Sequence, residues 1–391
     1  MSGPGRKLLT VLLLHSTVTQ VITFVLRPTS AYRALELDVP AAWLGALTAS
    51  FAIVPLVLAV PSGQATDRFG ERRVMLVGAV LMALSGAVFW TERGGAAGLV
   101  LGSVVLGTGH LLSVVGQQAA VANTAGPGRF DTAFGYYTFA ASLGQAVGPA
   151  LITLIGGRGS LPDTTPIFLT ATALGIILLV CTAFLRMPVR EQAGGAAESG
   201  GLGTLLRLPG LLRALLVSCV VLAAVDITLV YLPALGADRG LAAGFVGLLL
   251  TLRAVASMGS RLFLGRLVRW VGRRRLMIAS VALSAVSMAV VAAPLPAVAM
   301  AVVVVLLGLG LGVGQPLTMS WLAEVAPAGL RGRAMSLRLT GNRLGQVLIP
   351  SAVGLAAAGV GAAGVLAATA AALAAVGVAA RRLAVDSGSA G

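Results

Sequence analysis

The sequence has few charged residues and almost no lysine. Asp, Glu, Lys and Arg together make up 10% of its 391 residues, whereas hydrophobic residues make up 57% and the mean hydropathy is +0.96. This composition excludes a string of soluble domains and indicates a membrane protein. Lys7 is the only lysine, and Ala, Gly and Val are abundant, which is typical of a GC-rich bacterial genome.

Cysteine and histidine are also scarce, with two of each. Cys181 and Cys219 both lie inside predicted helices, so they predict neither a disulfide framework nor a metal site. No nucleophile, base and acid are grouped outside the helices. We therefore expect no enzymatic activity, no metal and no cofactor. The expected energy source is a proton gradient.

Apolar segments of about 20 residues recur along the chain, and a helix of that length crosses about 30 Å of hydrocarbon. They predict an all-α integral membrane protein with about twelve transmembrane helices. The predicted spans are 8–27, 41–61, 74–91, 97–121, 134–155, 166–185, 213–235, 241–263, 276–292, 297–322, 335–358 and 362–380.

The net charge of +15 raises the alternative of nucleic-acid binding, which the placement of the basic residues argues against. Most lie at the N-terminus or at the exits of even-numbered helices: Arg6, Lys7, Arg68, Arg72, Arg73, Arg186, Arg190, Arg207, Arg266, Arg269, Arg273, Arg274, Arg275, Arg381 and Arg382. The opposite face holds only about five, namely Arg27, Arg33, Arg93, Arg158 and Arg239. This bias predicts a multi-pass protein of the bacterial inner membrane with both termini in the cytoplasm.

A hydrophilic stretch at 187–212 divides the predicted spans six and six. We expect an N-terminal six-helix bundle over 1–186, a flexible cytoplasmic linker over 187–212 and a C-terminal six-helix bundle with a short tail over 213–391. The halves echo one another about 201 to 202 residues apart, as expected for an internal repeat. The matching segments are Gly70-Glu71-Arg72-Arg73 with Gly272-Arg273-Arg274-Arg275, Leu106-Gly107-x-Gly109 with Leu307-Gly308-x-Gly310, and Leu143-Gly144-Gln145 plus Pro149 with Leu344-Gly345-Gln346 plus Pro350.

The loop after the second span carries a recognisable pattern, Gly63-x-x-x-Asp67-Arg68-x-Gly70-x-Arg72-Arg73. It resembles the signature loop of the major facilitator superfamily, and the six-plus-six plan extends the resemblance over nearly the whole chain. The resemblance implies two pseudo-symmetric six-helix bundles and transport by alternating access. A weaker copy begins at Gly265, with Arg269 and Trp270 in place of Asp67 and Arg68.

The residue types of this loop predict a contact with a neighbouring helix. Its glycines allow a tight turn, and Asp67 is placed to accept hydrogen bonds at a helix start, where the helix dipole favours an anion. In the family this contact closes the cytoplasmic gate when the transporter faces outward. The alternative is that Asp67, Arg68, Arg72 and Arg73 only set the topology.

The fifth span contains Gly135, Gly144 and Gly148-Pro149, spaced as in the antiporter motif of the family but without its closing Gly-Gly. Small residues at this spacing are also typical of a tight helix-packing seam. Ser103 stands where the drug–proton antiporters of the family carry an arginine, which argues against a standard multidrug exporter.

Charged groups within the hydrocarbon are costly unless paired or hydrated, so the few present are candidates for function. Asp226 and Arg253 are both predicted roughly 15 to 18 Å below the outer surface, on consecutive helices. Arg343 lies roughly 12 Å into the eleventh span from the cytoplasm. These three charges can converge on one site, or Asp226 and Arg253 can form a purely structural ion pair.

The eleventh span adds a polar stripe, because Arg338, Asn342 and Gln346 follow one another at intervals of four. Arg338 is predicted near the cytoplasmic edge, where its side chain can extend to the headgroups. Two compatible hypotheses follow. In one, the protonation of Asp226 is linked to substrate movement. In the other, Arg253 and Arg343 bind a carboxylate or other anion while Asp226 holds Arg253 in the empty site.

Polar residues in the first half complete the candidate site, namely His15, His110, Gln117, Gln118 and Gln145. Each histidine either makes one local hydrogen bond or belongs to a relay. The glutamines either line the pocket or pair helices. Outside the spans, Glu324 and Arg331 are predicted to form a gate salt bridge, or else to be a solvated surface pair.

The sequence thus predicts a monomeric, proton-coupled secondary transporter for a small organic solute, anionic or zwitterionic. Its expected partners are this solute and the lipid bilayer, and not nucleic acid. The alternatives are a proton-driven efflux antiporter for drugs or toxins and a non-transporting membrane sensor.

Overall fold

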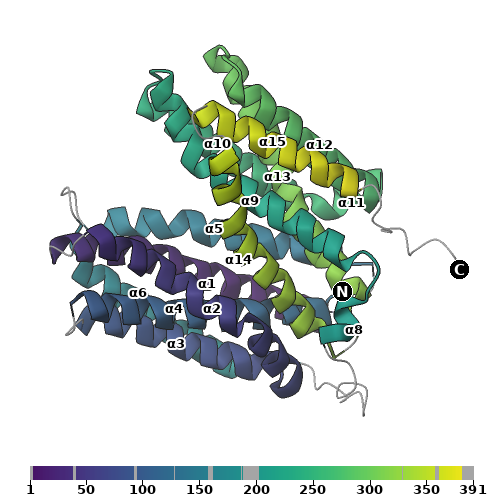
Figure 1. Ribbon diagram of the computed structural model, residues 1–391. Helices are drawn as coiled ribbons and strands as arrows, with labels where there is room; N and C mark the ends of the chain where they lie inside the picture. The colour runs from purple at the N-terminus through teal and green to yellow at the C-terminus, as the bar shows by residue number, and fades with distance from the viewer. Residues whose placement is uncertain are drawn as a thin grey trace, which may run out of the picture. The chain divides into compact units, whose positions relative to one another are not determined.

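The computed structural model describes residues 3–37, 41–91, 95–126, 128–156, 162–185, 187, 202–327, 329–356 and 361–380, and the regular elements in these ranges are helices. Twelve of the helices are at least 20 residues long: α1 (Gly3–Glu36), α2 (Ala41–Phe69), α3 (Glu71–Thr91), α4 (Ala96–Thr124), α5 (Phe130–Ile155), α6 (Thr164–Phe184), α9 (Leu211–Asp238), α10 (Ala243–Leu262), α12 (Arg273–Ala292), α13 (Ala297–Val325), α14 (Arg331–Ala356) and α15 (Gly361–Ala380). Two short helices, α8 (Leu202–Leu206) and α11 (Leu264–Val271), join them. The predicted all-helical membrane architecture is confirmed (Figure 1).

Nine of the helices in the described ranges have the length and hydropathy of membrane spans. The other three long helices are α2, α5 and α14, and α14 carries four arginines. A helix satisfies its own backbone hydrogen bonds, so it can continue beyond the apolar stretch that marks a span. For this reason α1 runs to Glu36 and α2 to Phe69, well past the predicted ends at residues 27 and 61.

The chain forms two compact units. Unit 1 contains Met1–Gly126, Ala140–Gly200 and Ala326–Leu337, and unit 2 contains Pro127–Phe139, Gly201–Val325 and Arg338–Gly391. Helices α5 and α14 therefore each supply residues to both units. The predicted division into two halves and a linker stays a prediction, and residues 188–201 of that linker lie outside the described residues.

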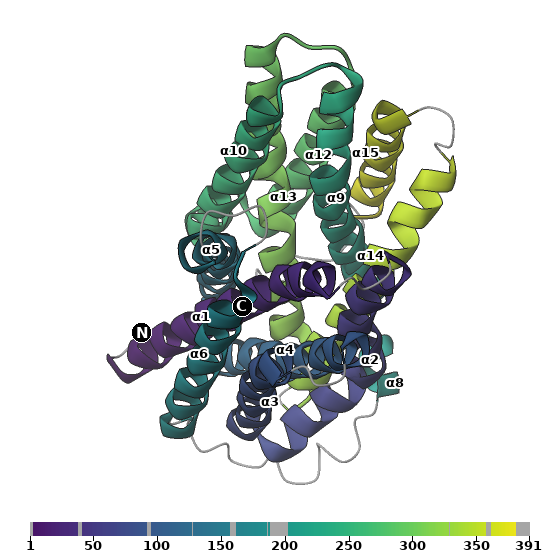
Figure 2. The ribbon, with the colours of Figure 1, turned by 90° about the vertical axis from the view of Figure 1, so that its left-hand side faces the viewer.

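The apolar core of unit 1 is built by α1, α2, α3, α4 and α6, together with Ile152 of α5. Phe89 of α3 stacks on Phe168 of α6 with 5.5 Å between the ring centroids, and Met82 and Ile22 are fully buried beside them. In unit 2, α13 packs against α9, α10 and α12, and α15 lies along α12 (Figures 1 and 2).

Glycines at equivalent positions permit the same close helix contacts in both units. A Cβ on Gly107 would collide with the carbonyl of Phe51 in α2, and a Cβ on Gly308 would collide with the carbonyl of Arg253 in α10. Phe51 and Arg253 are 202 positions apart, which is the repeat offset. The internal repeat therefore extends from sequence to packing.

The turns that follow α2 and α11 also match. Gly70 has a φ of 86° and Gly272 a φ of 82°, a left-handed conformation that side-chain-bearing residues rarely adopt. The left-handed backbone conformation therefore explains why Gly70 and Gly272 are glycines in the two copies of the loop motif.

Candidate functional site

A chain of side chains in unit 2 links an acid to an arginine. Gln346 of α14 donates from Nε2 to Oδ2 of Asp226 in α9 over 2.7 Å. Arg343, three residues earlier on α14, donates from Nη1 to Oε1 of the same Gln346 over 3.2 Å. One amide therefore receives a hydrogen bond from the cation and donates one to the acid, which connects two of the three predicted charges.

Arg253 of α10 supplies the third charge. Its side chain is only 6% exposed, and its Nε has no hydrogen-bond acceptor in the described part of the chain. Asp226 exerts an attractive Coulombic interaction on it. An arginine with an unused buried N–H has the donor geometry that an anionic ligand requires.

A second polar group surrounds Arg338. Arg338 donates from Nη1 to Oε1 of Gln315 in α13 over 2.8 Å, and Gln315 donates from Nε2 to the carbonyl of Ser218 in α9 over 2.8 Å. The Ser218 hydroxyl donates to Oδ1 of Asn342 over 2.8 Å. The predicted stripe on α14 thus faces α9 and α13.

The expectation that Arg338 reaches the headgroups is wrong, because its side chain is 2% exposed. Helix α14 begins at Arg331, four residues before the predicted edge, so Arg338 lies about 10 Å along the helix from its first residue. Neither Gln315 nor Ser218 was among the predicted site residues. The only signal for either was a single polar residue within a long apolar run.

In unit 1, His15 of α1 forms the centre of a buried network. Its Nε2 lies 2.8 Å from Oγ1 of Thr182 in α6, and its Nδ1 lies 2.7 Å from Nε2 of Gln117 in α4. Gln117 also donates to Oγ1 of Thr19 over 2.9 Å. The histidine therefore joins three helices, whereas one of the two readings of the sequence gave it a single local bond.

The remaining predicted residues of unit 1 form a looser group. Nε2 of Gln20 lies 3.4 Å from Nε2 of His110, and Gln145 donates to Oε1 of Gln20 over 3.5 Å. The ring of Phe51 lies 5.7 Å from that of His110, and the Arg27 guanidinium lies 4.4 Å above the Phe51 ring. Gln20 and Arg27 were not among the predicted site residues. Gln118 is 2% exposed in the same helix as His110.

The loop after α2 makes the helix-start contact that its residue types suggest. Asp67 accepts hydrogen bonds from the backbone N–H of Gly332 over 2.8 Å and of Arg333 over 3.0 Å, in the first turn of α14. The Arg333 side chain lies 3.7 Å from the same carboxylate. Gly63 permits this approach, because a Cβ there would collide with the backbone of both residues.

The arginines of the loop are exposed at the surface of unit 1. Arg68 lies over the ring of Phe69, and Arg72 donates to the carbonyl of Ala183. Arg73 is exposed. These contacts are compatible with arginines that set the orientation of the protein in the membrane. Of the charged residues in this loop motif, Asp67 is the one that contacts the start of α14.

The predicted salt bridge between Glu324 and Arg331 stays a prediction, because the two residues belong to different units. Glu324 pairs with Arg273, and Arg331 donates to the side chain of Asn123 over 3.1 Å. Arg273 also pairs with Asp131 of α5 over 2.8 Å. Arg273 is 51 residues from Glu324 in the sequence, so spacing did not identify it as the partner.

The glycines of α5 are explained by packing. A Cβ on Gly144 would collide with the carbonyl of Thr17, and one on Gly148 with Phe24, both on α1. At Gly135 the obstacle would be the carbonyl of Arg261 in α10.

In the described ranges there is no group of three His, Cys, Asp or Glu residues that could hold a metal ion.

Comparison with known proteins decides the class. The sequence model of the Major Facilitator Superfamily matches residues 8–241 and 214–389. The chain belongs to the Major Facilitator Superfamily. It is therefore a multi-pass membrane transporter with a small-molecule substrate, and not an enzyme.

Solved structures of this superfamily share the fold. The fucose:proton symporter of E. coli aligns with a TM-score of 0.81 over 95% of this chain and 97% of its own, at 14% identity. The human organic anion transporter MFSD10 aligns at 0.77 over 97% and 100%, at 18% identity. A bacterial homologue of the iron transporter ferroportin aligns at 0.79 over 95% and 98%, at 16% identity. No curated protein sequence matches the chain.

The contact of Asp67 with α14 leads to a first prediction. We expect Asp67→Asn to lower the free energy of unfolding by about 1–3 kcal/mol, because hydrogen bonds to a charged acceptor and an anion at a helix start are both weakened. Hydrogen exchange of the Gly332 and Arg333 amides should accelerate in the same variant. Hydrogen–deuterium exchange mass spectrometry of a peptide covering 330–336 measures this directly.

The matched control is Asp163→Asn, since Asp163 caps the start of α6 by accepting from the N–H of Thr165 in an exposed position. It should leave exchange over 330–336 unchanged. Equal exchange in wild type and Asp67→Asn would show that the carboxylate does not hold the first turn of α14.

Proposed function

We propose that this superfamily member is a proton-coupled transporter of a small anionic or zwitterionic organic solute. The observation that carries the proposal is the grouping of Asp226, Gln346 and Arg343 beside the buried Arg253. An organic carboxylate fits the donors of the two arginines, and Asp226 supplies a titratable group next to them.

The arrangement suggests an order of events. In the empty site, the Asp226 carboxylate balances Arg253 and receives the Gln346 amide. An arriving anion competes for the arginines and thereby favours protonation of Asp226. Proton uptake and anion binding are then thermodynamically linked, which is the requirement for coupling.

The fold is compatible with both features. Among its structural relatives are a fucose:proton symporter and an organic anion transporter, as their descriptions state. Because identity to each is below 20%, the substrate argument rests on the arginines of this chain.

We further propose a monomer in a bacterial inner membrane with both termini in the cytoplasm, on the basis of the arginine bias between alternate loops. The second candidate function is drug or toxin efflux by proton antiport, which the glycines of α5 favour. Their contacts with α1 and α10 are sufficient to explain them, and two cations beside one acid do not suit a cationic drug.

A thermal-shift screen tests the proposal. We expect small carboxylates and amino acids, but not lipophilic cations, to raise the melting temperature of the purified protein. At a ligand concentration of 100 times Kd, binding should add about 2.7 kcal/mol to the free energy of unfolding. Arg253→Gln and Arg343→Gln should each abolish this shift. The control is Arg207→Gln, which removes an exposed arginine at the end of α8. Stabilisation by lipophilic cations that survives in both arginine variants would favour efflux instead.

A further inference from the structure

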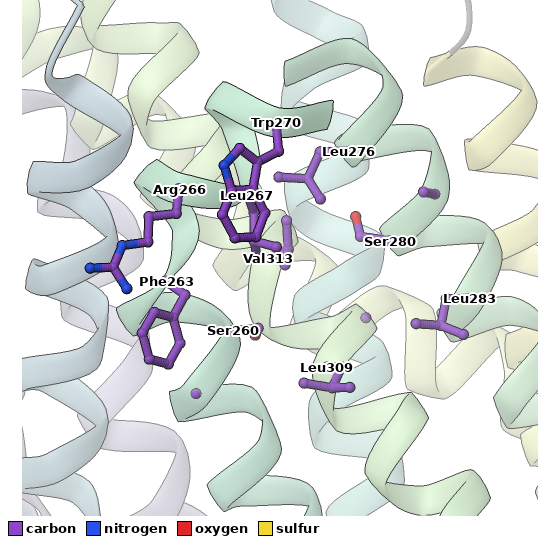
Figure 3. Close-up of a pocket in the computed structure, with 13 residues that line it drawn as sticks. Ser260, Phe263, Arg266, Leu267, Trp270, Leu276, Ser280, Leu283, Leu309 and Val313 are labelled. Carbon is purple, nitrogen blue, oxygen red and sulfur yellow. The ribbon is translucent and has the colours of Figure 1, made fainter. Parts of the chain in front are cut away.

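Two cavities flank the short helix α11 in unit 2. The larger has a volume of about 650 Å³ and lies between α10, α12 and α13. Its walls are almost entirely apolar and include Phe263, Leu276, Leu283, Leu309 and Val313 (Figure 3). A cavity of this kind accommodates a hydrocarbon chain.

The smaller cavity, of about 400 Å³, has a different chemistry. Thr132 and Tyr136 of α5 line it together with Arg266 and Arg269 of α11. It therefore offers two guanidinium groups and two hydroxyl groups, a donor set suited to a phosphate. Phe263 and Arg266 line both cavities, so the two form one amphipathic site.

Figure 3 shows how the side chains divide between the two chemistries. The Arg266 guanidinium points away from Leu276, Ser280 and Leu283, while its stem passes above Phe263. The guanidinium carbon lies 5.7 Å from the centre of the Phe263 ring. Trp270 stands at the edge of the apolar cavity, with its side chain 78% exposed.

The position of α11 places this site at a membrane surface. One membrane span ends at Leu262 and the next begins at Arg273, and α11 is the segment between them. Exposed tryptophan and arginine are typical of the headgroup region. The apolar cavity extends from α11 along the two spans, as an acyl chain below a headgroup would.

The charge of the region selects an anionic occupant. Asp238 and Glu324 have no acidic residue between them in the sequence, and Glu324 and Asp131 both pair with Arg273. Arg266 and Arg269 are exposed. The potential around the smaller cavity is therefore positive.

We propose that this site binds one anionic phospholipid, with the phosphate on Arg266 and Arg269 and an acyl chain in the cavity between α10, α12 and α13. Basic pockets between transmembrane helices at the membrane surface recognise anionic headgroups in this way. The Thr132 and Tyr136 hydroxyls complete the headgroup contacts. A neutral lipid gains the apolar contacts but not the electrostatic ones.

Fluorescence of Trp270 tests the proposal. The full-length protein, with Trp43, Trp90 and Trp321 replaced by Phe, is placed in nanodiscs of phosphatidylcholine and titrated with phosphatidylglycerol brominated on its acyl chains. Bromine quenches tryptophan at contact, so we expect saturable quenching at a low mole fraction. Arg266→Gln and Arg269→Gln should each weaken the apparent affinity about fivefold, the loss expected for one basic residue near an anionic headgroup.

Two further variants separate the site from ordinary lipid contact. Arg207→Gln with Arg213→Gln removes two exposed arginines, one just after α8 and one in α9, and should leave the titration unchanged. Ala279→Phe fills the apolar cavity and should reduce quenching while the arginines remain. Equal quenching by brominated phosphatidylcholine, or an unchanged titration in the Arg266 and Arg269 variants, would overturn the proposal. The proposal would also be overturned if a neutral hydrophobic dye displaced the lipid equally well from the wild-type protein and from the Arg266 and Arg269 variants.

Discussion

Asp226→Asn is expected to abolish substrate-driven proton movement while the protein continues to fold and to exchange substrate. Asparagine has nearly the volume of aspartate, and its Oδ1 can still accept the hydrogen bond from Gln346 that now spans 2.7 Å. It has no titratable proton and no charge to balance Arg253. The variant therefore removes coupling and leaves the packing of α9 against α14 intact.

Proteoliposomes containing a pH-sensitive dye provide the measurement. Addition of the anion identified by thermal shift should change the internal pH with the wild-type protein, and should have no effect beyond that in empty liposomes with Asp226→Asn. Exchange of labelled against unlabelled substrate, which needs no net proton flux, should persist. The matched control is Asp238→Asn, an exposed acid at the end of the same helix.

Either of two outcomes would contradict the proposal. If Asp226→Asn still carries protons with substrate, another group couples transport, and the His15 network of unit 1 becomes the next candidate. If the wild-type protein moves substrate without protons, the transporter is not proton-coupled. Loss of exchange together with proton flux would instead identify Asp226 as a binding residue.

Much of the fold was predictable because membrane burial leaves a strong signal. Apolar runs gave the twelve helices, and the repeat offset gave equivalent packing positions such as Gly107 and Gly308. The period of the helix placed Arg338, Asn342 and Gln346 on one face of α14, and all three use that face for their contacts.

The partners of these residues were not predictable. Gln315 and Ser218 are isolated polar residues in apolar helices, and only the packing of α9 with α13 brings them to α14. Helix α11 escaped prediction for another reason. It is short and carries two arginines, and it begins one residue after the predicted span ends at 263, so hydropathy gave no signal for a helix there.

The last prediction concerns Arg338, one of the largest fully buried side chains among the described residues. We expect Arg338→Ala to lower the free energy of unfolding by about 3–5 kcal/mol, since it creates a cavity and removes a charged donor from Gln315. The apparent melting temperature should fall by on the order of 10 °C. Arg207→Ala, at an exposed position, should change stability by no more than about 0.5 kcal/mol.

Arg338→Met distinguishes a structural role from a functional one. Methionine retains most of the apolar volume and has no charge to desolvate, and replacing buried charged groups with apolar ones often leaves a protein equally or more stable. If Arg338 serves only stability, Arg338→Met should lose stability and keep transport in proportion to the folded fraction. If it serves transport, the variant should melt at or above the wild-type temperature and fail to bind the anion. The second result would mean that the buried Gln315, Ser218 and Asn342 network exists to hold a cation where hydrophobic packing alone would be more stable. The substrate site would then extend along α14 from Gln346 to Arg338.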